Sequence, residues 1–216
     1  MANLSIAIDG PAGAGKSTIA KKIALLKNLV YIDTGAMYRA FTLKLINKNI
    51  PLDNYDLIKE VLKDTEIDIV DGKIYLDNVN VSSEIRKPII NKNVSQIASI
   101  PFVREFLVKL QRKIAENNNV IMDGRDIGTK VLPYAKYKFF LTASIEERAK
   151  RRYKELKEKG YKCSLKDVIG EIANRDKMDS ERKVDPLKKA DDAILIDTTG
   201  KTIEEVINEI LSMIDM

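Results

Sequence analysis

The residues with the clearest chemical meaning form a glycine-rich loop near the start of the chain. The segment Gly10–Ser17 reads GPAGAGKS, fits the pattern G-x-x-x-x-G-K-[ST], and follows the apolar run Leu4–Ile8. Glycines at this spacing let backbone N–H groups turn toward bound phosphates, and a helix starting at Ser17 adds its positive end. Lys16 would reach the β- and γ-phosphates, and the Ser17 hydroxyl would bind Mg²⁺. A glycine turn can match this pattern by chance, but the flanking strand and helix favour a nucleoside triphosphate site.

A second candidate lies where another apolar run ends. Val120–Met122 is followed by Asp123 and then by Gly124-Arg125-Asp126. In a fold with a phosphate-binding loop, a carboxylate at this strand end organises Mg²⁺ directly or through water. Aspartate also forms ordinary turns at strand ends, so the loop at Gly10–Ser17 is what favours the magnesium interpretation. Arg125 and Asp126 would lie at the carboxyl edge of the sheet, where ligands bind in open α/β folds.

Arginines make up the third set of candidates. In the segment Asp33-Thr34 we expect Thr34 to cap a helix. Arg39 follows in that helix, and the fork of N–H groups on the arginine suits a phosphate. Further arginines lie later in the chain: Arg148, Arg151 and Arg152 share one face of a predicted helix, and Arg175 and Arg182 follow around Asp179. Such a charged run could be a solvated surface or a nucleic-acid patch, but interspersed acidic residues and few aromatics weaken the latter. Several arginines around a triphosphate fit phosphoryl transfer, which depends on stabilising negative charge.

Composition narrows the chemistry further. The 216 residues carry a formal net charge of +5, which suits a polyanionic ligand. The absence of histidine excludes Ser-His-Asp and Cys-His mechanisms and histidine-bound metals. Cys163 is the single cysteine, and neither a secretory signal pattern nor an apolar run of about 20 residues occurs, so we expect a cytoplasmic protein without a membrane span.

The candidate residues must be positioned by an alternation of strands and helices, which predicts an α/β fold with a parallel sheet and helices on both faces. The apolar runs predict strands at 4–8, 29–32, 120–122, 137–141 and 193–196. Helical periodicity and start signals predict helices at 17–26, 35–47, 101–117, 144–159, 164–177 and 202–213. Residues 66–81 alternate in polarity around Asp71-Gly72 and Asn78, which predicts a small antiparallel insertion.

Taken together, these segments resemble the bacterial cytidylate kinases, which are phosphate-loop nucleoside monophosphate kinases, over essentially the whole chain. The matching segments are 6–17, 33–39, 123–129, 148–152, 175–182, 186–187 and 196–200, together with the small β insertion. The resemblance implies transfer of the γ-phosphoryl group of ATP to CMP or dCMP, in pyrimidine nucleotide metabolism, with Mg²⁺. It also implies one kinase domain over 1–216. The core would comprise about 1–34, 118–147 and 190–216, the monophosphate-binding region about 35–117, and the lid with its arginine segment about 148–185.

The resemblance also implies roles for individual residues. Lys16, Asp123, Arg125 and Arg182 are similar to catalytic residues, and Ser17 with Asp123 (through water) to metal-binding ones. The implied ATP-binding residues are Gly10, Pro11, Ala12, Gly13, Ala14, Gly15, Lys16, Ser17, Thr18, Arg148, Arg151 and Arg152. The implied substrate-binding residues are Thr34, Arg39, Ser95, Arg104, Arg125, Asp126, Arg175, Asp179 and Arg182. Within this set, Ser95, Arg104 and Asp126 resemble the residues that read the base.

Base chemistry supports the role implied for Asp126. Its carboxylate can accept a hydrogen bond from the cytosine amino group but would face a carbonyl oxygen in uracil. Two alternatives remain: a kinase for UMP, AMP or dTMP, and a nucleotide-dependent NTPase that acts as a switch or on nucleic acid. We expect ATP and CMP or dCMP as partners, no nucleic acid or membrane, and a monomer.

Overall fold

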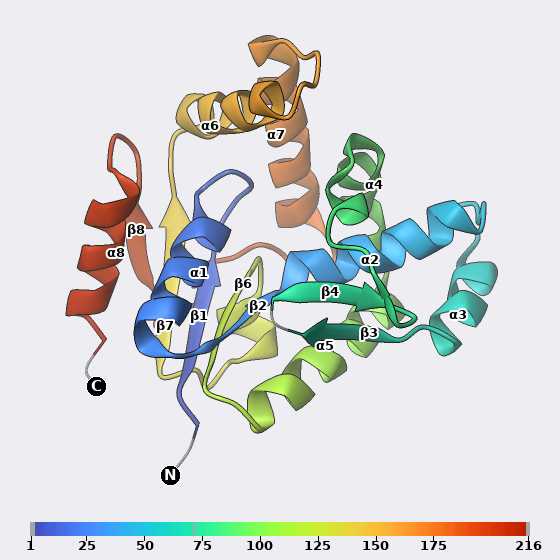
Figure 1. Ribbon diagram of the computed structural model, residues 1–216, viewed down its shortest axis with the longest axis horizontal. Coiled ribbons are helices and arrows are strands. Elements are labelled where there is room, and N and C mark those ends of the chain that lie inside the picture. The colour runs from blue at the N-terminus through green and yellow to red at the C-terminus, as the bar shows by residue number, and fades with distance from the viewer. Residues whose placement is uncertain (1–2, 71, 215–216) are drawn as a thin grey trace. The chain divides into compact units, whose positions relative to one another are not determined.

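The computed structural model describes residues 3–70 and 72–214, which form two compact units (Figure 1). The first unit contains the residues up to Tyr31 and those from Asn117 onward, and the second contains Ile32–Glu116. The phosphate-binding loop and the arginine-rich helices belong to the first unit. The small β insertion belongs to the second.

A five-stranded sheet organises the first unit and has the order β2-β6-β1-β7-β8. Its strands are β1 (Ser5–Asp9), β2 (Val30–Asp33), β6 (Val120–Gly124), β7 (Tyr137–Thr142) and β8 (Ile194–Asp197). β1 pairs in parallel with β6 and β7, and β7 with β8. The register places Ile8 beside Asp123 and Asp9 beside Gly124, so polar residues meet where β1 and β6 end.

Two helices and this sheet share a buried apolar core. The helices are α1 (Lys16–Lys27) and α8 (Ile203–Ser212), shown blue and red in Figure 1. Ile19 and Ile23 of α1 and Ile207 and Ile210 of α8 pack with apolar residues of β1, β6, β7 and β8. This burial removes apolar surface from water and fixes the sheet under the start of α1.

The arginine-rich segments form a pair of helices, α6 (Ile145–Glu158) and α7 (Leu165–Glu181), with a small core of their own. Ala149 and Leu156 of α6 pack against Val168 and Ile172 of α7. Between β6 and β7 the chain makes a single π-helical turn, η2 (Ile127–Val131). Turns of this kind are rare and often mark functional sites.

The second unit is largely helical. It comprises α2 (Thr34–Asn47), α3 (Tyr55–Lys63), η1 (Glu84–Arg86), α4 (Pro88–Ala98), α5 (Pro101–Glu116) and an antiparallel sheet of β3 (Ile67–Val70), β4 (Lys73–Leu76) and β5 (Val79–Asn80). Lys44 of α2 is buried; it donates to the Asp64 carbonyl at 2.6 Å and pairs with Asp77 at 2.7 Å. These contacts tie α2 to the ends of α3 and β4.

The predicted α/β fold, with its parallel sheet, helices and small antiparallel insertion, is confirmed. Two helices, α3 and α4, were not predicted, and the cap predicted at Thr34 is wrong. Asp33 caps α2 instead: its carboxylate accepts from the Ala36 N–H at 2.8 Å, and Thr34 is already helical. Asp71 of the predicted turn lies outside the described residues. Within the described ranges, no helix has the length and apolar character needed to cross a membrane.

Candidate active site

The glycine-rich loop joins β1 to α1. Gly10, Gly13 and Gly15 have φ values of 145°, 78° and 87°, which side chains with a Cβ rarely adopt. A Cβ at Gly10 would also collide with the Leu141 carbonyl oxygen. Lys16 is buried and donates to the Pro11 carbonyl at 2.7 Å. The loop therefore folds back on itself with the lysine stem inside it.

One carboxylate lies next to the first turn of α1. Ser17 Oγ donates to Asp123 Oδ2 at 2.8 Å, and the Tyr31 hydroxyl donates to Asp123 Oδ1 at 2.7 Å. The register of β1 and β6 produces this contact, since Asp123 lies beside the residue that precedes Asp9. A hydroxyl and a carboxylate side by side match the oxygen ligands that Mg²⁺ takes when water and phosphates complete its shell. Among the described residues, no group of three or more acidic, cysteine or histidine side chains could hold a metal.

Two predicted residues pair across 54 positions of the sequence. Arg125 Nε donates to Asp179 Oδ2 at 2.8 Å, and Arg175 Nε lies 3.9 Å from the same oxygen. Burial opposes the charge of Asp179, but Arg125 and Arg175 outweigh it and lower its pKa. Burial likewise opposes the charge of Arg125, and Asp179 raises its pKa. Both groups are therefore ionised, and α7 is fixed to the end of β6.

A second pair lies beside it. Arg182 follows α7 directly; its Nη2 lies 3.1 Å from Asp126 Oδ1, and its Nε donates to the Asp185 carbonyl at 2.5 Å. Both side chains are almost completely buried. Burial lowers the pKa of Lys16 well below its ordinary value, and Arg125 adds to that effect. The end of β6 thus collects positive charge close to the loop lysine, as an anion site requires.

Arg148 contacts the loop directly. It donates to the Ala12 carbonyl at 2.9 Å and to Asp176 at 2.5 Å, and its Nε donates to the Ala143 carbonyl at 2.9 Å. Asp176 also accepts from the Ala12 N–H at 3.0 Å. The start of α6 and the middle of α7 therefore hold the glycine-rich loop from one side.

The other two arginines of α6 are more exposed. Arg151 donates to the Thr198 carbonyl at 2.7 Å and to its hydroxyl at 3.0 Å, whereas Arg152 pairs with Glu155 at 2.6 Å on the same helix. Thr18, which was predicted to bind ATP, lies exposed on α1. Arg148 thus contacts the loop itself and Arg151 the segment after β8, whereas Arg152 contacts only its own helix in these interactions.

In the second unit, Asp33 is the centre of a charged cluster. Arg39 Nη2 lies 3.1 Å from both of its oxygens, and Arg86 Nη2 lies 2.6 Å from Oδ2. Burial opposes ionisation of Asp33, but these two arginines outweigh it and hold its pKa at about 2. Arg86 was not predicted as a site residue; its contact with Asp33 is not visible from sequence spacing.

The remaining predicted residues of the second unit are buried polar side chains. Arg104 donates to the Ala98 carbonyl at 3.1 Å and lies over the Tyr38 ring at 5.6 Å from its centre. Ser95 is buried on α4, three residues before Ala98, and Thr34 is buried in the first turn of α2. Arg104 therefore links α5 to α4 and α2. Ser95 lies on α4 one turn before Ala98, the residue that Arg104 contacts.

Sequence reasoning missed two aspartates of the first unit. Asp176 contacts Arg148 and the loop, as described above. Asp9 ends β1 and accepts from the backbone N–H groups of Ile127 and Gly128. The signal for Asp9 was available: it follows an apolar strand, as Asp123 does.

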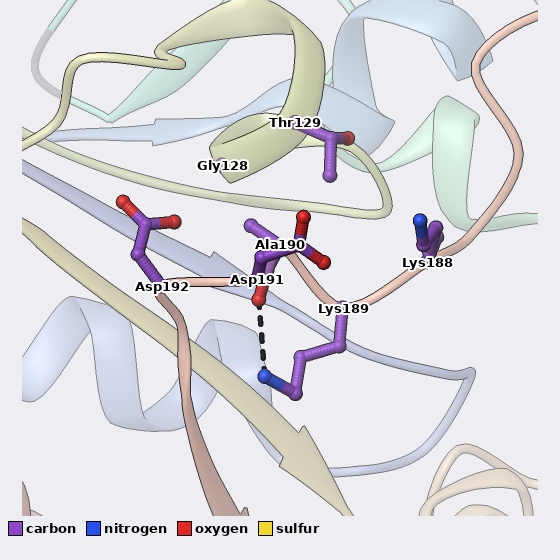
Figure 2. A pocket seen from close by; sticks show the side chains of 7 residues that line it. All are labelled: Gly128, Thr129, Lys188, Lys189, Ala190, Asp191 and Asp192. Atoms are coloured by element: carbon purple, nitrogen blue, oxygen red, sulfur yellow. Dashed lines mark hydrogen bonds between the residues drawn. The ribbon is translucent and has the colours of Figure 1, made fainter.

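A separate pocket of about 300 Å³ lies beside η2 (Figure 2). Its lining comes from Gly128 and Thr129 and from the segment 188–192. Lys189 donates to the Ala190 carbonyl at 3.0 Å there. None of the predicted site residues lines this pocket.

Known proteins resemble this chain over nearly its whole length. A cytidylate kinase of Caldanaerobacter subterraneus subsp. tengcongensis is 57% identical over 216 residues, covering 99% of this chain and 96% of that protein. A cytidylate kinase of Clostridioides difficile is 53% identical and covers both chains completely. An uncharacterised protein from Eubacterium ventriosum, of known crystal structure, aligns with a TM-score of 0.56 at 17% identity, over 99% of this chain and 98% of that one, which concerns the fold alone. The cytidylate kinase family profile matches residues 6–216, and the chain belongs to that family.

Proposed function

We propose that the protein transfers the γ-phosphoryl group of ATP to CMP or dCMP and produces ADP with CDP or dCDP. A phosphate oxygen of the acceptor attacks the γ-phosphorus, and the bond from that phosphorus to the β–γ bridging oxygen breaks. The attacking oxygen is already ionised, so no general base is needed. Catalysis then consists of alignment and charge stabilisation.

The loop Gly10–Ser17 binds the ATP phosphates through its backbone N–H groups, and Lys16 exchanges the Pro11 carbonyl for phosphate oxygens. Ser17 directly and Asp123 through water would hold Mg²⁺, which neutralises charge on the β- and γ-phosphates when bound. The support for this arrangement is the 2.8 Å contact between Ser17 and Asp123 directly after the glycine-rich loop, which is the observation that carries the proposal.

Arg125 and Arg182 stabilise the transferred phosphoryl group, and Arg39 binds the acceptor phosphate. Each of these arginines is already held by an aspartate: Arg125 by Asp179, Arg182 by Asp126 and Arg39 by Asp33. Such pairing fixes a guanidinium group before substrate binds, so less entropy is lost on binding. Arg175 and Asp179 bind near the acceptor sugar and phosphate.

The residues that read the base are Ser95, Arg104 and Asp126. The cytosine amino group donates to the Asp126 carboxylate, and a site built for that donor can reject an analogue without it by about 10⁴-fold. The segment 148–185, which contains most of α6 and all of α7, closes as a lid whose arginines cover ATP and exclude water. The small core of α6 and α7 supports movement of the pair as a body.

The test is ADP formation from Mg-ATP with CMP, dCMP, UMP, AMP and dTMP as separate acceptors. We expect CMP and dCMP to be phosphorylated far faster than the others. A Lys16→Ala protein purified in parallel controls for contaminating kinases. Turnover led by another monophosphate would overturn the base-reading assignment, and ADP formation without an acceptor would indicate an NTPase. The monomeric state and the cytoplasmic location stay predictions from the sequence.

A further inference from the structure

Asp9 makes contacts that the proposed chemistry does not use. It ends β1, and its side chain is almost completely buried. Oδ1 accepts from the Ile127 N–H at 2.8 Å, and Oδ2 accepts from the Gly128 N–H at 2.7 Å. Ile127 and Gly128 come directly after Arg125 and Asp126 in the chain. By binding these two amides, Asp9 holds the backbone next to the Arg125 and Asp126 side chains.

This geometry requires two acceptor atoms at one position. An ionised carboxylate offers two oxygens to two successive N–H groups, whereas an asparagine amide offers one oxygen and places its NH₂ group against the other N–H. The space around the segment is also closed. A Cβ on Gly128 would lie 3.4 Å from Asp9 Oδ2 and 3.2 Å from Lys138 Cδ. A side chain at Gly128 would therefore point toward both the Asp9 carboxylate and the Lys138 stem.

A carboxylate is a costly way to satisfy two backbone amides. Burying it opposes ionisation, and the two backbone hydrogen bonds only partly offset this, so the pKa of Asp9 rises to about 7. Asp126 raises that pKa further, and Lys16 lowers it. Lys16 and Asp126 both have proposed roles at the site, so the charge of Asp9 is coupled electrostatically to two residues of that site.

We propose that Asp9 is a positioning residue that fixes Arg125 and Asp126 toward the acceptor nucleotide by holding the amides of Ile127 and Gly128 at the end of β1. The inference rests on the proposed roles of Arg125 and Asp126. It gives the last residue before the glycine-rich loop a function at the acceptor site.

The test is steady-state kinetics of Asp9→Asn with each substrate varied in turn. We expect the KM for CMP to rise about tenfold or more, since the asparagine NH₂ group replaces one acceptor oxygen and leaves one buried backbone N–H without its partner. The KM for ATP should change less than about twofold, and the preference for CMP over UMP should narrow. Ile210→Val, a core change on α8, is the matched control. It lowers stability in the same unit and should leave both KM values and the CMP preference unchanged.

Equal changes in both KM values, or no change in either, would overturn the proposal. If Asp9→Asn does not fold, two measurements decide instead. Hydrogen exchange of the Ile127 and Gly128 amides in the unaltered protein should be slow, and exchange at the rate of an open loop contradicts the inference. Gly128→Ala should raise the KM for CMP selectively, because its Cβ would lie 3.2 Å from Lys138 Cδ and 3.4 Å from Asp9 Oδ2 and so crowd the segment that Asp9 holds. An unchanged KM for CMP counts against the inference.

Asp126→Ala in the same assays separates this inference from the proposed function. If Asp126→Ala leaves the preference for CMP unchanged while Asp9→Asn still raises the KM for CMP, the base-reading assignment fails and positioning through Arg125 stands. If the unaltered protein phosphorylates no monophosphate, the proposed function fails. The exchange measurement then still decides whether Asp9 holds the segment.

Discussion

Two buried aspartates end strands of the same sheet and behave in opposite ways. Asp9 ends β1 in the first unit, and Asp33 ends β2 and belongs to the second. Both carboxylates accept hydrogen bonds from backbone N–H groups. Yet burial raises the pKa of Asp9 to about 7, whereas Arg39 and Arg86 overcome burial and hold the pKa of Asp33 at about 2.

The difference lies in the partners and not in burial. Two guanidinium groups at 2.6–3.1 Å keep Asp33 ionised, so it can act as a permanent anchor for arginines. Two backbone amides hold Asp9 without direct ion pairing to a cation in the contacts of the described residues. A carboxylate paired with arginine stabilises a unit, whereas one paired with amides holds a segment in place and its charge state responds to the surroundings.

The largest effect is expected at the lysine that influences Asp9. Lys16→Ala should reduce turnover about 10³-fold or more while the fold remains intact, because the phosphates lose their main point charge. The same change removes a positive charge that lowers the Asp9 pKa. The measurement is kcat with Mg-ATP and CMP, with circular dichroism as a check on folding. Lys22→Ala, on the same helix but in an exposed pair with Glu204, should keep normal turnover. Activity near the normal level in Lys16→Ala would contradict the role of the loop.

Removing the Asp33 carboxylate, which anchors two arginines, should mainly affect stability. Asp33→Asn leaves Arg39 and Arg86 without their shared carboxylate, and breaking a buried ion pair costs about 3–5 kcal/mol. Urea denaturation at pH 7 measures the change in the free energy of unfolding. Glu60→Gln, which breaks an exposed pair with Lys63 in the same unit, should change it by less than about 1 kcal/mol. An equally small effect at Asp33 would show that the cluster is not an anchor.

The pH dependence of stability should separate the two aspartates. The folded pKa of Asp33 is depressed from 3.8 to about 2, so its stabilisation of about 2 kcal/mol is present above pH 4 and is lost as pH falls toward 2. The folded pKa of Asp9 is raised from 3.8 to about 7, so its contribution is present below pH 4 and is lost as pH rises through 7. Asp33→Asn should reduce the pH dependence of the free energy of unfolding only at acidic pH. Asp9→Asn should reduce it only between about pH 4 and 7. Identical profiles for both variants would refute the contrast.

Base recognition offers a further test in the first unit. Asp126→Ala should narrow the preference for CMP over UMP by about tenfold or more, because the cytosine amino group loses its acceptor. The ratio of the two kcat/KM values measures this, and an unchanged ratio contradicts the assignment. Removing Asp126 also removes a negative charge that raises the Asp9 pKa. The change in the free energy of unfolding between about pH 4 and 7 should therefore become smaller.

The same two aspartates show what the sequence can and cannot predict. The glycine-rich loop and Asp123 were recognised because their signals are local: a motif, and a carboxylate after an apolar strand. Asp9 satisfies the second rule as well, but its partners are the amides of Ile127 and Gly128, which lie 118 and 119 positions away and which no local pattern specifies. The cap was assigned to Thr34 although Asp33, one residue earlier, offers the stronger acceptor and takes the position. The pair of Arg125 with Asp179 joins residues 54 positions apart, and no local pattern specifies such a contact.

The smallest expected effect comes from a third side chain that accepts a backbone N–H, but at the surface. Thr202 caps α8 by accepting from the Glu205 N–H at 3.2 Å, and the Glu205 carboxylate accepts from the Thr202 N–H in return. Thr202→Ala should cost about 1 kcal/mol, or about 2–4 °C in melting temperature, equally at pH 5 and pH 8. A neutral cap in water has no charge to bury, so its contribution does not titrate as Asp9 does. If differential scanning calorimetry showed the loss in Thr202→Ala changing across that range, a pH-dependent loss in Asp9→Asn could not be ascribed to the burial of its charge.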